Sequence, residues 1–237
     1  MEKTNKLKNN IIILSIGILS LIIFVVAYYI KNNTTKDNVI QGISNLDKIG
    51  NVTKDEIDNI YSYLSSVDCN NNLIWDFPNN NIITVEDMEE DLKAKIVFSS
   101  LDLLNLLNDK LTKDIVKKEH KKIFGEKESK SFNLFFLEYN GNVYNTTDNN
   151  TEIKKVNKCS NSDIVSKLIK YDNNNTELYL YISVGIINNN KLYDTTNKLV
   201  GEYDSIDEMN NLLDKSTTYK YIFYRENSNL ILYGVSK

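Results

Sequence analysis

The feature that most constrains this chain is a run of twenty uncharged, mostly apolar residues near its start. Residues 11–30 read IIILSIGILSLIIFVVAYYI. A helix rises about 1.5 Å per residue, so the run spans about 30 Å, the thickness of the hydrocarbon core of a bilayer. Tyr28 and Tyr29 stand at its end, where aromatic side chains mark a membrane interface. The run therefore predicts a single transmembrane helix.

The lysines around this run predict its orientation. Three lysines lie among residues 1–10, whereas Lys31 and Lys36 on the other side are diluted by Asn and Thr. Basic residues favour the cytoplasmic side of a membrane. We therefore expect a cytoplasmic tail (1–10), an anchor in the cell membrane, and an extracytoplasmic chain beyond it.

A cleavable signal peptide is the main alternative to an anchor. Val25, Val26 and Ala27 form an acceptable cleavage site. However, the apolar region of a signal peptide is about 7–15 residues long, and this run is longer and continues past the site. We therefore expect the span to remain uncleaved.

Residues 31–37 form a short polar linker, and residues 38–237 form the exported domain. About 200 residues are enough to bury a core without metal or disulfide support. The first 30 residues hold three lysines and one glutamate, which leaves 25 basic and 31 acidic residues, a net charge of −6, in the exported part. A domain of this sign is repelled by phosphate backbones, so nucleic-acid binding is not expected.

Helical patterns occupy residues 38–125, and strand patterns occupy residues 131–237. Asn140-Gly141 is a strong signal for a hairpin with a type I′ turn. This order predicts an α+β domain with several helices packed on one face of a curved antiparallel sheet. The expected helix boundaries are Gly50 as a C-cap, capping boxes at Thr53 with Glu56 and at Thr84 with Asp87, a helix from Thr112 to Gly125, and a short helix capped by Ser205 and Glu208. The expected strands after the first hairpin are 152–158, 163–171, 176–187, 190–195, 217–226 and 229–236.

Catalytic and metal-binding side chains are scarce. The chain has one His and two Cys, so a zinc site with four Cys or His ligands is not expected. His120 is the only His available to a catalytic triad, and its spacing from Val116 and Phe124 favours a place on an apolar helix face. The glycines are scattered singly and form no phosphate-binding loop. We therefore expect no catalytic residues, no metal and no cofactor.

Acidic residues are plentiful, and the densest group is Asp87, Glu89, Glu90 and Asp91. We expect it to be a solvated helix surface. A hydrolase that uses such carboxylates is an alternative, and it requires a convergent acidic pair with raised pKa values in a deep pocket.

Cys69 and Cys159 both follow the span and are therefore expected on its outer side, where a disulfide can persist. Closing a loop of about 90 residues would contribute roughly 4 kcal/mol in the chain-entropy model. Two separate buried thiols are the alternative. Trp75 lies in the same loop as Cys69, and we expect it to pin that loop to the core.

Aromatic residues on two strands are the candidate ligand site. On the strand 176–187 tyrosines alternate with aliphatic residues, and on the strand 217–226 three aromatic residues share a face with Arg225. If the aliphatic face holds the helices, a tyrosine-lined concavity can face outward and suit an apolar or peptide ligand. The alternative is that these side chains are half-buried on the sheet. The candidate residues are Tyr179, Tyr181, Tyr219, Tyr221 and Phe223.

Three features carry a resemblance to known proteins. They are the head of Lys and Asn before the span, residues 122–125 (KIFG) at a helix end, and residues 219–223 (YKYIF) in a late strand. On these features the chain resembles single-span, membrane-anchored extracytoplasmic proteins of low-GC Gram-positive bacteria over most of its length. That group has no established activity, so the resemblance implies no functional residues. The expected sheet also resembles NTF2-like and cystatin-like folds in shape.

We expect a non-enzymatic, membrane-tethered extracytoplasmic module that binds an envelope protein, a peptide or a small apolar ligand. The carboxylate hydrolase is one alternative. A pilin-like structural subunit is another, because pilins also join an N-terminal apolar helix to a C-terminal sheet. The sequence lacks the small-residue processing site before the span and the Glu near its start that would favour a pilin.

Overall fold

The computed structural model describes residues 47–65, 75, 77, 82–156 and 163–237. They belong to one compact unit, Gly42–Lys237. Within these ranges, no helix is long and apolar enough to cross a bilayer. The predicted tail, anchor and linker (1–37) lie outside the described residues, as do Cys69 and Cys159.

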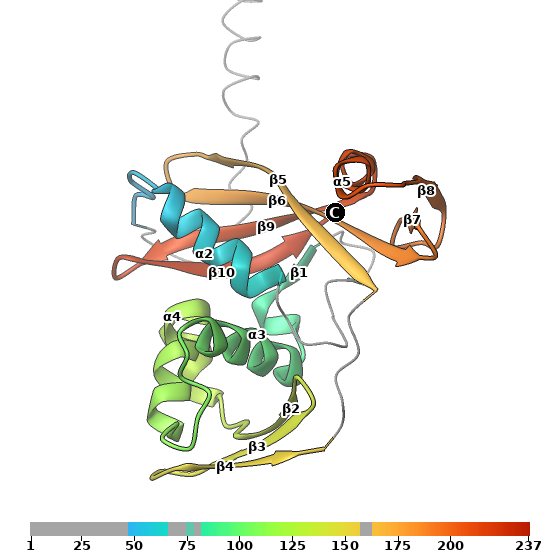
Figure 1. The fold of residues 1–237 in the computed structure, drawn as a ribbon. Helices are drawn as coiled ribbons and strands as arrows, with labels where there is room; N and C mark the ends of the chain where they lie inside the picture. Colours follow the sequence, from blue (N-terminus) through green and yellow to red (C-terminus); the bar gives the residue numbers. More distant parts are fainter. Residues whose placement is uncertain (1–46, 66–74, 76, 78–81, 157–162) are drawn as a thin grey trace, which may run out of the picture. The chain divides into compact units, whose positions relative to one another are not determined.

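The described residues form helices and two antiparallel sheets, so the predicted α+β class is confirmed (Figure 1). The helices are α2 (Lys54–Ser65), α3 (Glu90–Leu103), α4 (Lys113–Ser131) and α5 (Ile206–Leu213), with a 3-10 helix η1 (Val85–Asp87) before α3. The large sheet contains β1 (Ile82–Thr84), β5 (Ile164–Asn173), β6 (Glu177–Asn188), β7 (Lys191–Tyr193), β8 (Leu199–Glu202), β9 (Thr217–Glu226) and β10 (Asn229–Ser236). The small sheet contains β2 (Phe136–Tyr139), β3 (Asn142–Thr146) and β4 (Thr151–Lys155). Of these strands, β1 and β8 were not predicted.

Strand β6 is the centre of the large sheet. It pairs with β9 and then with β7 along one edge, and with β5 along the other. β10 and β1 continue the sheet beyond β9, and β8 continues it beyond β7. The last two strands of the chain thus lie in the interior of the sheet, where they support the helices from the first half of the chain.

One face of the large sheet is the main core surface. The register pairs Leu180 of β6 with Tyr221 of β9, and both side chains are fully buried. Helix α2 packs on this face, because Arg225 of β9 reaches Glu56 of α2 from the same side as Tyr221. This arrangement buries large aromatic and aliphatic side chains together in a single cluster.

Helix α5 lies on the opposite face. Lys167 of β5 pairs with Ser183 of β6, and Ser183 points away from the core face because it alternates with Ile182. The Nζ of Lys167 donates to Asp214 Oδ1 at the end of α5 over 2.6 Å, and to Asn210 O over 3.1 Å. The expectation that the helices pack on one face therefore does not hold for α5.

Helices α3 and α4 lie between the large and the small sheet (Figure 1). The inner face of the small sheet buries Tyr139 and Tyr144 against Phe98 of α3, with ring centroids 6.1 Å and 5.3 Å apart. Because these tyrosines must face α3, β2–β4 form a separate sheet. The predicted single sheet is therefore replaced by two sheets that share one core.

The capping boxes form, but only one of them starts the helix that was predicted. Thr53 and Glu56 cap each other at the start of α2, as expected. Thr84 and Asp87 also form a box, yet it caps η1 and not α3. Met88 then adopts an extended conformation and is buried, so α3 begins only at Glu90.

Two glycines mark further differences. Both have positive φ, +66° at Gly50 and +86° at Gly125. Gly50 does not cap a helix, because residues 47–53 contain no helix and Ile49 donates its N–H to Asn175 O over 2.9 Å. At Gly125 the chain leaves the helical conformation as predicted, but helix α4 resumes after this kink and ends at Ser131.

Candidate ligand-binding pocket

The five aromatic residues predicted to bind a ligand do not share one face of the sheet. Tyr219, Tyr221 and Phe223 are fully buried on the core face. The register of β6 and β9 places the aliphatic residues of β6 beside them, so Tyr179 and Tyr181 lie on the opposite face. The described residues therefore do not form the predicted tyrosine-lined concavity.

The aromatic side chains of β9 already have a partner within the chain. Trp75 Nε1 donates to Tyr221 Oη over 3.0 Å, and the two ring centroids are 6.2 Å apart. The ring of Phe77 lies 5.6 Å from that of Tyr219. The prediction that Trp75 pins its loop to the core is confirmed. Trp75 and Phe77 thus lie against two of the residues that were expected to take a ligand, Tyr221 and Tyr219.

The two tyrosines of β6 lie in polar surroundings. Tyr179 donates a short hydrogen bond to Glu177, and Asn174 Nδ2 donates to both, over 3.0 Å and 2.9 Å. Burial, followed by the bond to Glu177, raises the pKa of Tyr179. The ammonium group of Lys170 lies 4.6 Å from the ring centroid of Tyr181. A ligand-binding role for Tyr179 and Tyr181 stays a prediction.

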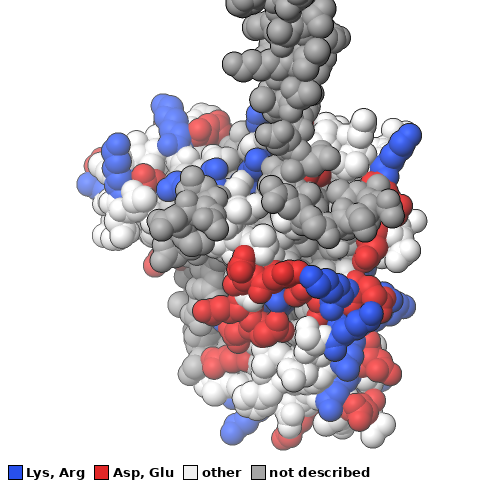
Figure 2. Space-filling model, turned by 180° about the vertical axis from the view of Figure 1, so that it is seen from behind, with Lys and Arg blue, Asp and Glu red and all other residues white. Residues whose placement is uncertain are grey.

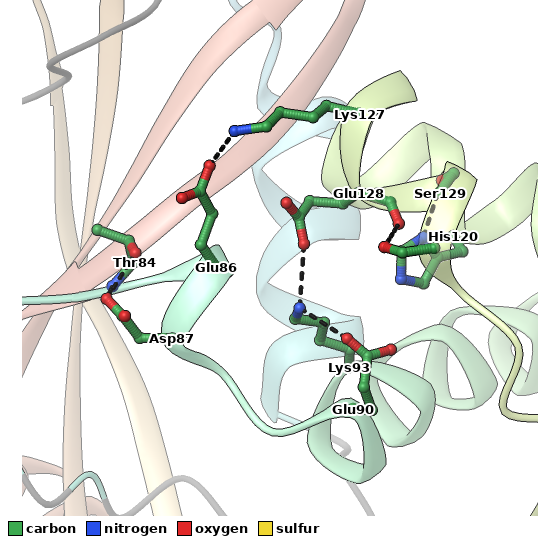
Figure 3. A network of polar contacts seen from close by, with 10 residues as sticks. Thr84, Glu86, Asp87, Glu90, Lys93, His120, Lys127, Glu128 and Ser129 are labelled. Atoms are coloured by element: carbon green, nitrogen blue, oxygen red, sulfur yellow. Dashed lines mark hydrogen bonds and ion pairs between the residues drawn. The ribbon is translucent and has the colours of Figure 1, made fainter.

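His120 is a core residue and is buried more deeply than its sequence context indicated. Its ring stacks on Phe132 with centroids 4.0 Å apart, and its Nδ1 lies 2.8 Å from Ser129 Oγ (Figure 3). Burial, together with the positive charge of Lys93, lowers its pKa to about 3. The imidazole is therefore neutral near pH 7. Within the described part of the chain, its Nε2 has no hydrogen-bond partner.

Lys93 connects α3 to the part of α4 beyond the kink (Figure 3). Its buried ammonium group donates to Glu90 Oε1 over 2.9 Å and to Glu128 Oε2 over 3.0 Å. Burial alone would lower the pKa of Lys93, but these two bonds raise it above the ordinary value. Both partners of this buried charge are carboxylates, so removing either of them would leave the buried ammonium group incompletely paired.

A pocket of about 260 Å³ lies between α2, the end of α3, α4 and the turn that joins β9 to β10. Helix α3 stops here because Asn105 adopts a left-handed conformation and Leu106 donates its N–H back to Leu101 O. On the other side, Asn227 and Ser228 both have positive φ, as a type I′ turn requires. The lining residues are Glu56, Asn59, Ile60, Tyr63, Ser100, Leu103, Leu104, Glu119, Lys122, Ile123, Ser228, Asn229 and Leu230.

Much of this lining is apolar. Tyr63, Ile123 and Leu230 are buried, whereas Leu103 and Leu104 are 49% and 50% exposed at the end of α3. The two leucines extend the apolar surface of the pocket to its rim. The pocket can therefore desolvate an apolar group of a ligand.

Arg225 connects the β9–β10 turn to α2 and to the segment before α2, beside the pocket. Its Nε donates to Ile49 O over 2.7 Å and its NH1 to Ser228 O over 2.8 Å, while NH2 lies 3.3 Å from Glu56 Oε1. The bond from the backbone N–H of Thr53, and then the charge of Arg225, lower the pKa of Glu56. Glu56 is therefore held ionised and paired at the side of the pocket.

Glu119 is the second carboxylate of the pocket and is also paired. Its Oε1 accepts from Ser100 Oγ over 2.7 Å and from Lys122 Nζ over 3.1 Å. Burial, and then the charge of Glu119, raise the pKa of Tyr63. A carboxylate hydrolase needs an acid with a raised pKa, whereas the pKa of Glu56 is lowered. The hydrolase alternative stays a prediction.

The acidic cluster predicted as surface is exposed at Asp87, Glu89, Glu90 and Asp91. Part of it is neutralised locally, since Asp91 lies 2.9 Å from Lys95. Figure 2 shows the same pattern on one face of the molecule, where acidic side chains border on lysines. Among the described residues, no group of three or more His, Cys, Asp or Glu side chains is placed to hold a metal ion.

Comparisons with protein-family models, with curated proteins and with solved structures found no match. The resemblance to anchored proteins of Gram-positive bacteria therefore stays a prediction. The interpretation of the pocket rests on its own geometry.

Sequence patterns did not predict this pocket. Its lining comes from residues 56–63, 100–104, 119–123 and 228–230, and only the tertiary fold brings these segments together. The one local signal was the leucine-rich end of α3, where residues 103–107 hold more leucines than one helix face can bury.

Proposed function

We propose that this chain is a membrane-tethered extracytoplasmic module that binds a peptide or protein segment in the pocket between α2, α3, α4 and the β9–β10 turn. We propose further that it acts by binding and not by catalysis. The observation that carries the proposal is the joint presence of a 260 Å³ pocket and two half-exposed leucines, Leu103 and Leu104, beside it.

The composition of the pocket favours one class of ligand. Its volume is below the range of about 300–1,000 Å³ typical of sites for whole small molecules, so one or two apolar side chains fit it better than a cofactor does. Glu56 and Glu119 are already paired, which disfavours a strongly charged ligand. Asn59 and Asn229 in the lining offer amide groups to a peptide backbone.

The tether is supported by the uncharged run 11–30, whose length matches a bilayer. Alkaline carbonate extraction of cell membranes tests it. The full-length chain is expected to stay in the membrane pellet, and a variant without residues 11–30 is expected to leave it. Release of the full-length chain by carbonate would contradict the anchor.

Photo-crosslinking in cells tests the binding pocket. A photoreactive phenylalanine analogue replaces Leu104 in one variant and Ile206 in a matched control, since Ile206 is 73% exposed on α5, which packs on the other face of the large sheet. We expect a discrete protein adduct from position 104 that is absent from position 206. A Leu103→Asp substitution in the crosslinking chain should remove the adduct. No adduct, or the same adduct from both positions, would refute a binding role for the pocket.

A further inference from the structure

Strand β4 leaves an open edge on the small sheet. The order of this sheet is β2-β3-β4, and β4 is its outermost strand (Figure 1). Within the described part of the chain, β3 is the only strand that pairs with β4. An edge strand of this kind presents unpaired backbone groups that can template another strand.

The hydrogen-bond pattern identifies which residues of β4 point outward. Val156 donates its N–H to Gly141 O over 3.0 Å, which fixes the alternation of bonds between β3 and β4. By this alternation, Thr151, Ile153 and Lys155 direct their backbone N–H and C=O groups away from β3. Of these outward groups, the N–H of Thr151 already donates to Asp109 O over 3.1 Å. Among the residues that the structure describes, none bonds to the outward backbone groups of Ile153 and Lys155.

We propose that this edge pairs with the same edge of a second copy of the chain, antiparallel and centred on Ile153. In this register, Glu152 of each copy lies opposite Lys154 of the other. These are non-hydrogen-bonded positions, where opposing Cα atoms approach to about 4.5 Å and side chains interact most closely. The side chain of Ile153 is 39% exposed in the single chain, and Ile153 of the second copy covers it in the dimer.

The charges of β4 select this register over its neighbours. A register that pairs Ile153 with Lys155 places Lys154 opposite Lys154. A register that pairs Ile153 with Thr151 places Glu152 opposite Glu152. Like charges at directly opposed positions destabilise a sheet, so only the pairing centred on Ile153 sets unlike charges against each other at these positions.

The backbone groups limit the length of this contact. Ile153 exchanges its N–H and C=O bonds with Ile153 of the second copy. The pairing ends before Thr151, because Asp109 O already lies opposite the N–H of Thr151 and occupies the place that Lys155 of the second copy would take. The contact is small, so we expect a weak, reversible dimer in solution.

Sedimentation of the full-length chain in detergent micelles, at rising protein-to-detergent ratio, tests the proposal. Glu152→Lys and Lys154→Glu each set like charges opposite each other and are expected to weaken association about 10-fold or more. The double variant Glu152→Lys/Lys154→Glu restores unlike pairs with the net charge of the wild type, so its association should return to within about 3-fold of the wild type. Near-UV circular dichroism checks that each variant is folded.

A backbone variant provides an independent readout. Ile153→Pro removes an N–H that faces away from β3, where an edge strand tolerates proline, and it should abolish association. A wild-type chain that stays monomeric at every ratio would overturn the proposal. So would single variants that associate like the wild type, or a double variant that remains as weak as the single ones.

Discussion

The clearest quantitative test concerns His120, because it is the only histidine of the chain. In the folded protein its pKa is lowered to about 3 by burial and by the nearby charge of Lys93. In the unfolded chain a histidine titrates at about 6.5. Between these two values the unfolded state binds the additional proton, so the free energy of unfolding falls as the pH falls below 6.5. Two pH units below that value, at pH 4.5, the loss is about 2.7 kcal/mol.

Urea unfolding at pH 7 and pH 4.5 measures this loss, with the fluorescence of Trp75 as the probe. Trp75 is the only tryptophan and contacts Tyr221 in the core, so its emission should change on unfolding. In His120→Leu the contribution of about 2.7 kcal/mol should disappear from the difference between the two pH values. The control Ser129→Ala loses the hydrogen bond to the imidazole but keeps the imidazole, and it should retain most of the pH dependence.

Two results would refute this reasoning. One is an equal pH dependence of stability in the wild type and in His120→Leu. The other is an NMR titration of the folded protein in which the imidazole signals of His120 move with a midpoint near 6.5, because a buried neutral ring should not titrate there.

Three further predictions concern stability and the cysteines. Gly125→Ala should lower the free energy of unfolding by about 1–3 kcal/mol, since φ is +86° and a Cβ would stand 3.0 Å from a carboxylate oxygen. The control Gly50→Ala also has a positive φ but adds its Cβ to open space, so it should lower the free energy of unfolding by about 1 kcal/mol. Equal losses of stability in thermal melts would contradict the packing argument. Arg225→Lys should lower the free energy of unfolding in urea by about 1–3 kcal/mol, because an ammonium group cannot make all the hydrogen bonds of the guanidinium group simultaneously. Unchanged stability would count against this role of Arg225. If Cys69 and Cys159 form a disulfide, the unfolded chain should take up no alkylating agent without reductant; uptake of two equivalents would favour free thiols.

Local patterns predicted the local structure well. The Thr53 capping box begins α2, Thr112 is the N-cap of α4, and Asn140 and Gly141 both adopt the positive φ of a type I′ turn. Each of these outcomes depends on groups within about four residues of one another, which is why a sequence alone can predict them. The α+β class follows from the same local periodicities.

Contacts between distant segments could not be predicted in the same way. The small sheet is separate because its tyrosines pack on α3, and the pocket exists because the β9–β10 turn meets α2 through Arg225. Strand β1 has three residues and forms only because it pairs with the last strand of the chain. None of these contacts has a signal of its own in the sequence.

The misplaced aromatic site has a more instructive cause. The alternation along β9 correctly set its three aromatic residues on one face with Arg225. It also set Thr218 and Lys220 on the other face, and this polar pair indicates that the aromatic face is the core face. The expectation of an outward concavity assumed that these aromatic residues share a face with the tyrosines of β6, whereas they lie beside the aliphatic residues of β6. Comparing the polar residues of neighbouring strands is the physical signal that would have corrected it.

The central claim is that residues 11–30 hold the binding pocket outside the cytoplasm. Protease added to intact cells tests it most directly, with detection of a tag at Lys237 and of a cytoplasmic marker protein in the same sample. The account predicts that the tagged domain is cleaved before the cells are opened, while the marker stays intact. A tagged domain that survives until the cells are lysed would contradict it.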